Sequence, residues 1–352
     1  MSNVKDFLKR KDIVITPQRY LIEALGAMAQ GLFASLLIGT IIKTLGQQTG
    51  IAFLVTAGGY AAAVSGPAMA CAIGWALHCP PLVLFSLITV GYSANALGGA
   101  GGPLAVLIIA IVASELGKAV SKETRVDILV TPLVTIFSGV GLSMLIAAPI
   151  GAAASQVGTL IMWATEQAPL VMGILVSVIV GVALTLPISS AAICAALGLT
   201  GLAGGAAVAG CCAQMIGFAV MSYKENGVGG LVSQGLGTSM LQMGNIVKNP
   251  RIWIAPTLAS AITGPLATCV FHFEMNGAAV SSGMGTCGLV GQIGVYTGWV
   301  SDIAAGTKAA ITPMDWAAMV LLCFVLPAVL SVIFCEIERK LGWIKEGDLK
   351  LN

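Results

Sequence analysis

The chain has 352 residues, of which 57% are hydrophobic and only 9% are charged. Ordinary globular domains carry about a quarter charged residues, so this composition excludes a soluble globular protein. The formal net charge is +2, and no basic stripe is interleaved with aromatic residues, which argues against direct nucleic-acid binding. We therefore expect a polytopic α-helical membrane protein that is embedded in a lipid bilayer.

The start of the chain combines basic and apolar side chains without the compact apolar core of a cleaved signal peptide. The basic residues are Lys5, Lys9, Arg10 and Lys11. We predict that residues 1–18 form an amphipathic helix on the anionic cytoplasmic face of the membrane, leading into the first span through Pro17. A solvated tail is the alternative interpretation.

Long apolar blocks recur along the rest of the chain. The clearest are Tyr20–Leu45, Leu129–Ala148, Leu170–Leu186, Ile252–Phe271 and Met314–Phe334. A helix needs about 20 apolar residues to cross about 30 Å of hydrocarbon, and backbone groups in lipid must be paired within the segment. Since no polar linker separates soluble domains, we predict one all-α transmembrane domain over 19–335, with about 8–10 transmembrane helices, and a cytoplasmic tail over 336–352.

Basic residues outside these blocks cluster in short segments. They include Lys118, Lys122 and Arg125, then Lys224, then Lys248 and Arg251, and finally Arg339, Lys340, Lys345 and Lys350. Short loops rich in lysine and arginine mark the cytoplasmic side, so we place both termini in the cytoplasm, which implies an even number of complete crossings. Glu115 and Lys118 are neighbours on a helix, and we interpret them as a surface ion pair at the membrane interface.

Stretches rich in Gly, Ala, Ser and Pro interrupt the apolar sequence. They are Gly58–Gly66, Asn95–Pro103, Thr185–Gly205, Gly227–Gly244 and Asn276–Gly294. Small residues favour close helix packing in lipid, but the hydroxyl groups around Pro187 and around Gly283–Gly285 need protein or a water-filled cavity beside them. We predict two re-entrant or broken-helix segments at these positions, because paired interruptions surround the substrate site of many transporters.

Two short sequence matches raise the question of an internal repeat. Gly102–Ala105 and Gly264–Ala267 share the sequence Gly-Pro-Leu-Ala, and Ile128–Pro132 resembles Ile252–Pro256. Such matches arise readily in so biased a composition, so both a duplication and coincidence stay open.

No catalytic or metal-binding motif is present in the sequence. The nine cysteines show no Cys-x-x-Cys pair and no Cys/His pairing at metal spacing, so we interpret them as small buried hydrophobic residues. The glycine-rich stretch Gly98–Gly102 lacks the Gly-Lys-Ser/Thr of a nucleotide-binding loop. The two histidines do not define a Ser/His/Asp or Cys/His set. We predict no catalytic residues, no cofactor and no bound metal.

The segment His272–Asn276 places three polar side chains within five residues beside the second interruption. Ionisable groups near membrane depth are costly and tend to serve function. Interfacial residues that face headgroup water are the alternative. The predicted solute-binding residues are Thr185, Pro187, Ser189 and Ser190 at the first interruption, and His272, Glu274, Asn276, Gly285, Thr286 and Gln292 at the second.

Several motifs carry a family resemblance. Asp127–Leu133, Ala148–Gly151 and Pro187–Ala192 resemble, in this order, the fructose-like EIIC membrane subunits of the bacterial phosphotransferase system. Gly235–Gln242 and Gly283–Gly294 are similar to the stand-alone EIIC-like family that includes PfoR-type toxin regulators. The resemblance implies an elevator-type EIIC-like architecture, a homodimer, the bacterial inner (cytoplasmic) membrane, and sugar transport with separate EIIA and EIIB partners.

The sequence also departs from the fructose-like pattern. Ser189 and Ser190 stand where those subunits carry Asn and Lys, so a fructose substrate is not carried over. Glu274 is the candidate for the acidic residue of the family's second hairpin. No EIIA-like or EIIB-like domain is attached, so phosphotransfer would need separate partners.

Three hypotheses for the function follow. The first is an EIIC-like carrier that binds and translocates a small polar solute, such as a sugar or sugar derivative, by alternating access. The second is a ligand-sensing membrane regulator on the same scaffold, which contacts a cytoplasmic partner and transports nothing. The third, an ion channel, is disfavoured because no charged ring or repeated filter sequence is present.

Overall fold

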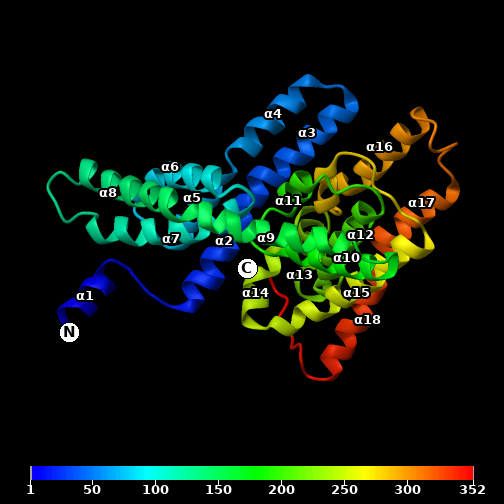
Figure 1. Cartoon of the computed structure of the whole chain (residues 1–352). Coiled ribbons are helices and arrows are strands. Elements are labelled where there is room, and N and C mark those ends of the chain that lie inside the picture. The colour runs from blue at the N-terminus through cyan, green and yellow to red at the C-terminus, as the bar shows by residue number, and fades with distance from the viewer. Residues whose placement is uncertain (1, 352) are drawn as a thin grey trace. The chain divides into compact units, whose positions relative to one another are not determined.

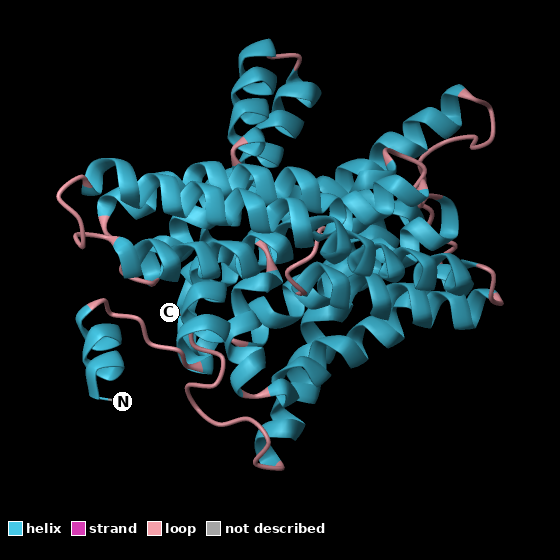
Figure 2. Ribbon diagram, turned by 60° about the vertical axis from the view of Figure 1, so that its left-hand side comes forward, coloured by secondary structure: helices cyan, strands magenta, loops and turns pink. Residues whose placement is uncertain are grey.

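The computed structural model describes residues 2–351, which are built from helices (Figures 1 and 2). No strand occurs among these residues, and a single isolated bridge joins Gly201 to Met275. The chain divides into two compact units, Met1–Ala154 and Ser155–Asn352. The all-α membrane fold expected from composition is confirmed.

The N-terminal unit consists of α-helices joined by short π-helical or irregular turns. Its helices are α1 (Ser2–Arg10), α2 (Leu25–Leu32), α3 (Ile38–Thr49), α4 (Ala52–Ala63), α5 (Ser65–Ala76), α6 (Pro81–Gly98), α7 (Gly102–Val120), α8 (Asp127–Leu142) and the start of α9 (Ala148–Thr165). Helices α3 and α4 form a hairpin that turns at Gly50, whose φ of 72° suits glycine. Helix α6 packs against α5, α7 and α8 (Figure 1).

A buried ionic cluster lies inside this unit. Lys118 is 2% exposed, and its Nζ donates to the carbonyl oxygens of Asp12 (2.9 Å) and Leu77 (3.0 Å) and lies 2.9 Å from a Glu115 carboxylate oxygen. Arg19 donates to the same Leu77 carbonyl, at 3.0 Å. The interpretation of Glu115 and Lys118 as a surface pair is therefore wrong, because the chain folds back and covers both.

The C-terminal unit surrounds one fully enclosed helix. Its helices are α10 (Pro169–Thr185), α11 (Ser190–Leu197), α12 (Gly201–Met221), α13 (Tyr223–Val232), α14 (Met243–Lys248), α15 (Ile254–Pro265), α16 (Val290–Ala304), α17 (Pro313–Val320) and α18 (Leu326–Lys340). Helix α12 packs against α10, α15 and α18. Its Gly, Ala and Cys residues permit this, because small side chains let helix backbones approach closely in a membrane protein.

The chain leaves the α-helical conformation at both predicted interruptions. After α10 it runs through Leu186–Ser189 to the eight-residue helix α11, which ends at Gly198 with a φ of 60°. The second interruption contains only the short 3₁₀ turns η9 (Ala279–Gly283) and η10 (Cys287–Leu289). Helix α11 packs against η9, so the two interruptions, far apart in sequence, meet in the fold.

Within residues 2–351, six helical runs are long and apolar enough to cross a membrane, or seven if the pair α4 and α5, bent by 50°, counts as one span. The run Pro81–Val120 folds back at Gly99, because Gly102 lies against Asn95 and α6 packs along α7. Counting α6 and α7 separately and adding α10 brings the number into the expected range of about 8–10.

Two predicted boundaries differ in the structure. Helix α1 ends at Arg10 rather than near residue 18, because Asp12 has a φ of 51° and residues 12–16 are irregular. At the other end, α18 continues to Lys340, so the tail predicted over 336–352 begins inside this helix.

Candidate functional site

A pocket of about 480 Å³ opens in the C-terminal unit beside the second interruption. This volume falls within the range of about 300–1,000 Å³ that is usual for small-molecule sites. Its lining comes from four places: the segment 271–276, the end of α16, the loop that leads into α17, and α17 itself. The polar lining residues are His272, Glu274, Asn276, Asp302, Thr307, Lys308 and Asp315.

Residues 272–276 form a non-helical segment that begins at His272, whose φ is 44°, and burial alternates along it. Phe273 and Met275 are buried, although Phe273 still borders the pocket, whereas His272, Glu274 and Asn276 are more exposed and line it. Alternation with period two is what an extended chain produces. The backbone of Met275 exchanges two hydrogen bonds of 3.0 Å with Gly201, which fixes the register of the segment against the start of α12.

Asn276 holds two carboxylates together at the pocket wall. Its Nδ2 donates to Glu274 Oε2 (3.0 Å) and to Asp302 Oδ2 (2.9 Å). Its Oδ1 accepts from the Gly201 N–H at 3.1 Å, which assigns the amide orientation. Each ionised carboxylate has about four acceptor positions, so lone pairs remain on both groups for the hydroxyl groups of a solute.

The loop before α17 contributes an ion pair. Lys308 donates to Asp315 Oδ1 at 2.9 Å and lies 6.0 Å from the centre of the Trp299 ring. Asp315 also accepts from the Thr312 N–H in the capping box of α17. The lining therefore carries three carboxylates and one lysine, an excess of negative charge that disfavours anionic solutes.

Aromatic rings form the apolar part of the pocket. Trp299 is 4% exposed and meets Trp316 edge to face, with ring centroids 5.5 Å apart. Trp316 in turn lies 5.9 Å from Tyr296. Edge-to-face contacts of this kind are favourable, so the pocket combines the ring of Trp299, packed against Trp316, with hydrogen-bond acceptors.

A separate polar seam runs through the interior of the same unit. The hydroxyl groups of Thr185 and Ser239 lie 2.7 Å apart, and Thr185 also contacts Gln214 Oε1 at 3.4 Å. Trp253 Nε1 donates to the same Gln214 oxygen at 2.8 Å. These groups are fully or largely buried and satisfy one another, as polar groups in a membrane interior must.

The two interruptions meet along this seam. Ser190 donates to the Gly283 carbonyl at 2.8 Å, and Ser189 caps α11 by accepting from the Ala192 N–H at 3.2 Å. Thr286 donates to the Gly235 carbonyl at 2.5 Å. These hydroxyls are thus bonded to protein in this conformation.

Gly285 and Gln292 complete the seam against α12. Gly285 has a φ of 52°, which favours glycine, and an added Cβ would lie 2.7 Å from the Cys211 Cβ. Both the backbone conformation and the lack of space therefore require glycine at this position. Gln292 Nε2 contacts Cys212 Sγ at 3.2 Å, whereas its buried Oε1 has no hydrogen-bond partner in the part of the chain that the structure describes.

Comparison with known proteins assigns the family. The model of the family "Phosphotransferase system, EIIC" matches residues 22–351, nearly the whole chain. The chain belongs to the EIIC family. No curated protein and no solved structure matches it. Membership confirms the resemblance found in the sequence, and together with the apolar helices it makes the protein a multi-pass membrane component of phosphotransferase-type transport.

The EIIC fold brings the predicted residues to two places rather than one. His272, Glu274 and Asn276 line the pocket. The others, Thr185, Ser190, Gly285, Thr286 and Gln292, lie in the interior seam, with Pro187 and Ser189 half-buried at the break before α11. Among the described residues, no group of three or more His, Cys, Asp or Glu side chains is arranged to hold a metal ion.

Sequence reasoning identified three of the seven polar residues that line the EIIC pocket. It missed Asp302, Thr307, Lys308 and Asp315, and also the ring of Trp299. The alternation of polar and apolar residues over 272–276 was the available signal, because it puts three polar groups on one face. Nothing local to 299–315 indicates that these residues approach that face.

Proposed function

We propose that this EIIC chain is a membrane carrier that binds and translocates a small neutral solute rich in hydroxyl groups, such as a sugar or sugar derivative. The observation that carries the proposal is the arrangement of Glu274 and Asp302 around one Asn276 amide, beside Trp299. Two fixed carboxylates can accept from neighbouring hydroxyls, while an aromatic face packs against the C–H groups of a sugar ring.

The charge of the pocket supports a neutral solute. Glu274, Asp302 and Asp315 outnumber the single Lys308 in the lining, so a phosphorylated solute would meet net repulsion. A solute that is phosphorylated only after it has crossed the membrane fits this electrostatic pattern, and separate EIIA and EIIB partners are part of the proposal for that reason.

We assign the interior seam a mechanical role in this proposal. Ser190 and Thr286 bond to carbonyl groups of the opposite interruption or of η5 (Ser233–Gly237). Alternating access requires one part of a carrier to move against another, and a seam of neutral hydrogen bonds can be exchanged for water or solute contacts at small cost. Thr185, Ser189 and Gln292 would then meet the solute in another conformation.

The test is solute binding and flux with Glu274→Gln. A panel of neutral hexoses and hexitols, with their phosphates as matched negatives, is measured by thermal shift and by uptake into proteoliposomes. Loss of a charged acceptor costs about 1.5–3 kcal/mol, so we expect affinity to fall by at least about tenfold. Glu166→Gln, an exposed carboxylate outside the pocket lining, is the control and should bind normally.

Binding that survives Glu274→Gln unchanged would refute the pocket assignment. Binding without flux would instead favour a ligand-sensing regulator on the same scaffold.

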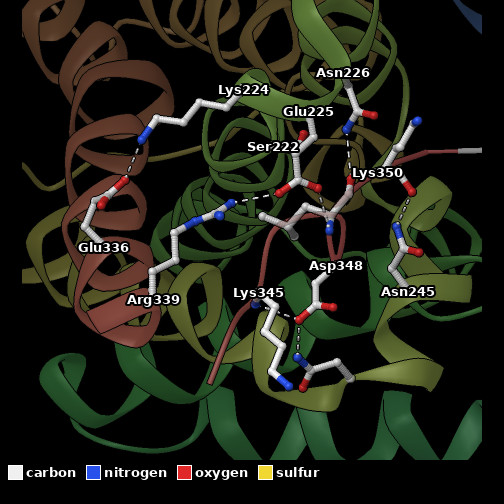
Figure 3. A network of polar contacts seen from close by, with 12 residues as sticks. Ser222, Lys224, Glu225, Asn226, Asn245, Glu336, Arg339, Lys345, Asp348 and Lys350 are labelled. Carbon is white, nitrogen blue, oxygen red and sulfur yellow. Dashed lines mark hydrogen bonds and ion pairs between the residues drawn. The ribbon is translucent and has the colours of Figure 1, made fainter. Parts of the chain in front are cut away.

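That second function has its own support, because the tail after Lys340 is held by a dense set of polar contacts (Figure 3) through which a partner can receive a signal. A homodimer in a bacterial inner membrane, with both termini cytoplasmic, remains our proposal for the assembly.

A further inference from the structure

The segment that follows α18 lies against the C-terminal unit as an irregular peptide (Figure 3). Two of its side chains are anchored in the interior: Ile344 is 3% exposed and Leu349 is fully buried. Between and around them, Lys345, Glu346 and Lys350 are exposed. The segment therefore has the pattern of a bound peptide, with apolar anchors separated by solvent-facing residues.

Asn226 forms two hydrogen bonds with the backbone of this segment. Its Nδ2 donates to the Leu349 carbonyl at 2.8 Å, and its Oδ1 accepts from the Leu351 N–H at 2.8 Å. A carboxamide presents a donor and an acceptor side by side, as a neighbouring strand does. Hydrogen bonds to main-chain atoms of this kind give a site affinity for the backbone of a peptide.

Other polar side chains converge on the same backbone. Glu225 Oε2 accepts from the Leu349 N–H at 2.9 Å, and Gln242 Nε2 donates to the Leu349 carbonyl at 2.9 Å. Asn245 donates to the Lys350 carbonyl, also at 2.9 Å. All of these contacts are to main-chain atoms, so they do not depend on the identity of the exposed side chains.

Three further contacts complete the site. Asn249 Nδ2 donates to the Trp343 carbonyl (2.9 Å) and to Asp348 Oδ2 (2.8 Å). Arg339 donates to Glu225 Oε1 at 2.9 Å, in an ion pair whose side chains are 18% and 7% exposed. The arginine thus orients the carboxylate whose other oxygen holds the peptide N–H.

We propose that Glu225, Asn226, Gln242, Asn245 and Asn249 form a peptide-binding site, the peptide clamp, which takes a segment that turns at Gly347 and has a buried leucine anchor. In this structure the clamp is filled by the chain's own residues 343–351. A cavity of about 430 Å³ beside Asn245, Asn249 and Asp348 leaves room at one edge of the bound segment. The site is distinct from the solute pocket.

The clamp is connected to the seam between the interruptions. Gln242 Nε2 also donates to Gln234 Oε1 at 2.9 Å, and Gln234 Nε2 donates to Ser222 Oγ at 2.8 Å. The neighbouring carbonyl of Gly235 accepts from Thr286. If the tail left the clamp, Gln242 Nε2 would therefore lose the Leu349 carbonyl as an acceptor, next to the seam. This regulatory consequence rests on the proposed carrier function, whereas peptide binding does not.

Peptide binding to the full-length chain tests the clamp. The variant Leu349→Asp evicts the tail, because a carboxylate cannot occupy the buried leucine position. A fluorescein-labelled peptide with the sequence of residues 343–352 is then titrated by fluorescence anisotropy. We expect saturable binding to Leu349→Asp and at least 100-fold weaker binding to the wild type, whose own tail competes at an effective concentration in the millimolar range.

Matched variants make the result specific. Adding Asn226→Ala to Leu349→Asp should weaken peptide binding at least tenfold, since two hydrogen bonds are lost. A peptide with Lys350→Ala should bind within about twofold, because only the carbonyl of Lys350 is contacted. A peptide with Leu349→Asp should not bind.

Equal binding to the wild type and to Leu349→Asp, or no effect of Asn226→Ala, would overturn the clamp. If Leu349→Asp fails to fold, the clamp is tested instead by amide hydrogen exchange, which is measured on the wild type and on the single variant Asn226→Ala. The amides of Leu349 and Leu351 should be protected in the wild type and exchange at least tenfold faster in the variant. Unprotected amides in the wild type refute the proposal. Neither measurement uses a transported solute. The clamp can therefore be refuted while the carrier function holds, and the carrier function can be refuted while the clamp holds.

Discussion

At the scale of single residues, Glu338 stands out because its carboxyl group is buried among the described residues without a partner. It is 3% exposed, and neither carboxylate oxygen has a hydrogen-bond partner among the described residues. Ser331, about two turns earlier in α18, has a buried hydroxyl that likewise finds no partner there. Removing a carboxylate from water without a partner costs several kcal/mol, so Glu338 destabilises this conformation.

Replacing Glu338 should therefore stabilise the protein. We expect Glu338→Met to raise the free energy of unfolding by at least about 1 kcal/mol, since an apolar side chain of similar length avoids the desolvation cost. Thermal unfolding in detergent measures it. Glu336→Gln is the control: this exposed carboxylate pairs with Lys224 at 3.0 Å, and such pairs contribute only about 0.2–1 kcal/mol. A lower melting temperature for Glu338→Met contradicts the argument.

Asp12 contributes stability that depends on pH. Burial raises the pKa of this carboxyl group, but hydrogen bonds from Arg19 and His78 and the nearby charges of Arg19 and Lys118 outweigh burial, and the pKa lies below its usual value of 3.8. A carboxyl group whose pKa is lower in the folded state stabilises the fold above its unfolded pKa. That contribution is lost as the pH falls through the lowered value.

We accordingly expect Asp12→Asn to melt at a lower temperature than the wild type at neutral pH. The difference should shrink below about pH 4, where the wild-type carboxyl group also takes up a proton. Melting temperatures over a pH series give the result. Asp6→Asn, at an exposed position in α1, should show no such trend, and a difference for Asp12→Asn that grows on acidification would show the sign to be wrong.

At the scale of elements, α12 is defined by close backbone contacts. A Cβ added to Gly205 would lie 1.7 Å from the Phe273 carbonyl oxygen, and one added to Gly210 would lie 1.9 Å from the Ser177 carbonyl oxygen. These glycines therefore let α12 touch both the pocket segment 271–276 and α10. The apolar sequence predicts such a helix, but its partners depend on the packing of the whole unit.

A substitution at the contact between Gly205 and the Phe273 carbonyl should strongly destabilise the protein. Gly205→Ala must displace the segment that carries Glu274 and Asn276, and we expect it to destabilise the protein by more than about 3 kcal/mol, as overpacking against rigid backbone does. Gly229→Ala in α13 has open space around it and should be neutral or slightly stabilising. Size-exclusion profiles and melting temperatures compare the two. Equal melting temperatures and size-exclusion profiles for the two variants would show that the close contact at Gly205 does not contribute to stability.

At the scale of the whole molecule, the two units bury polar groups of different kinds. The N-terminal unit buries charged groups, with Arg19 and Lys118 against carbonyl and carboxylate oxygens. The C-terminal unit buries the neutral amides Gln214, Gln234 and Gln242, together with the carboxyl group of Glu338. Neutral groups exchange partners more cheaply than buried charges do. The amide-rich interior of the C-terminal unit therefore resists rearrangement less than the charged cluster of the N-terminal unit.

Much of the fold was predictable because the relevant forces are local. Apolar blocks of span length must be helical in lipid, and the polar, glycine-rich stretches at Pro187 and Gly285 interrupt helices wherever they occur. The site was predictable only in part. Glu274 and Asn276 were identified from their own segment, whereas Asp302 and Lys308 were not, because they reach the pocket through the path of the chain after α16.

The sequence by itself determined that this is a helical membrane protein of the EIIC family and where its helices break, since hydropathy and backbone conformational limits act within a few residues. Only the tertiary structure decided that Asn276 joins Glu274 to Asp302, that Thr185 and Thr286 face protein, and that the tail fills a clamp. These pairings join residues far apart in the chain, and they form only when packing brings the segments together.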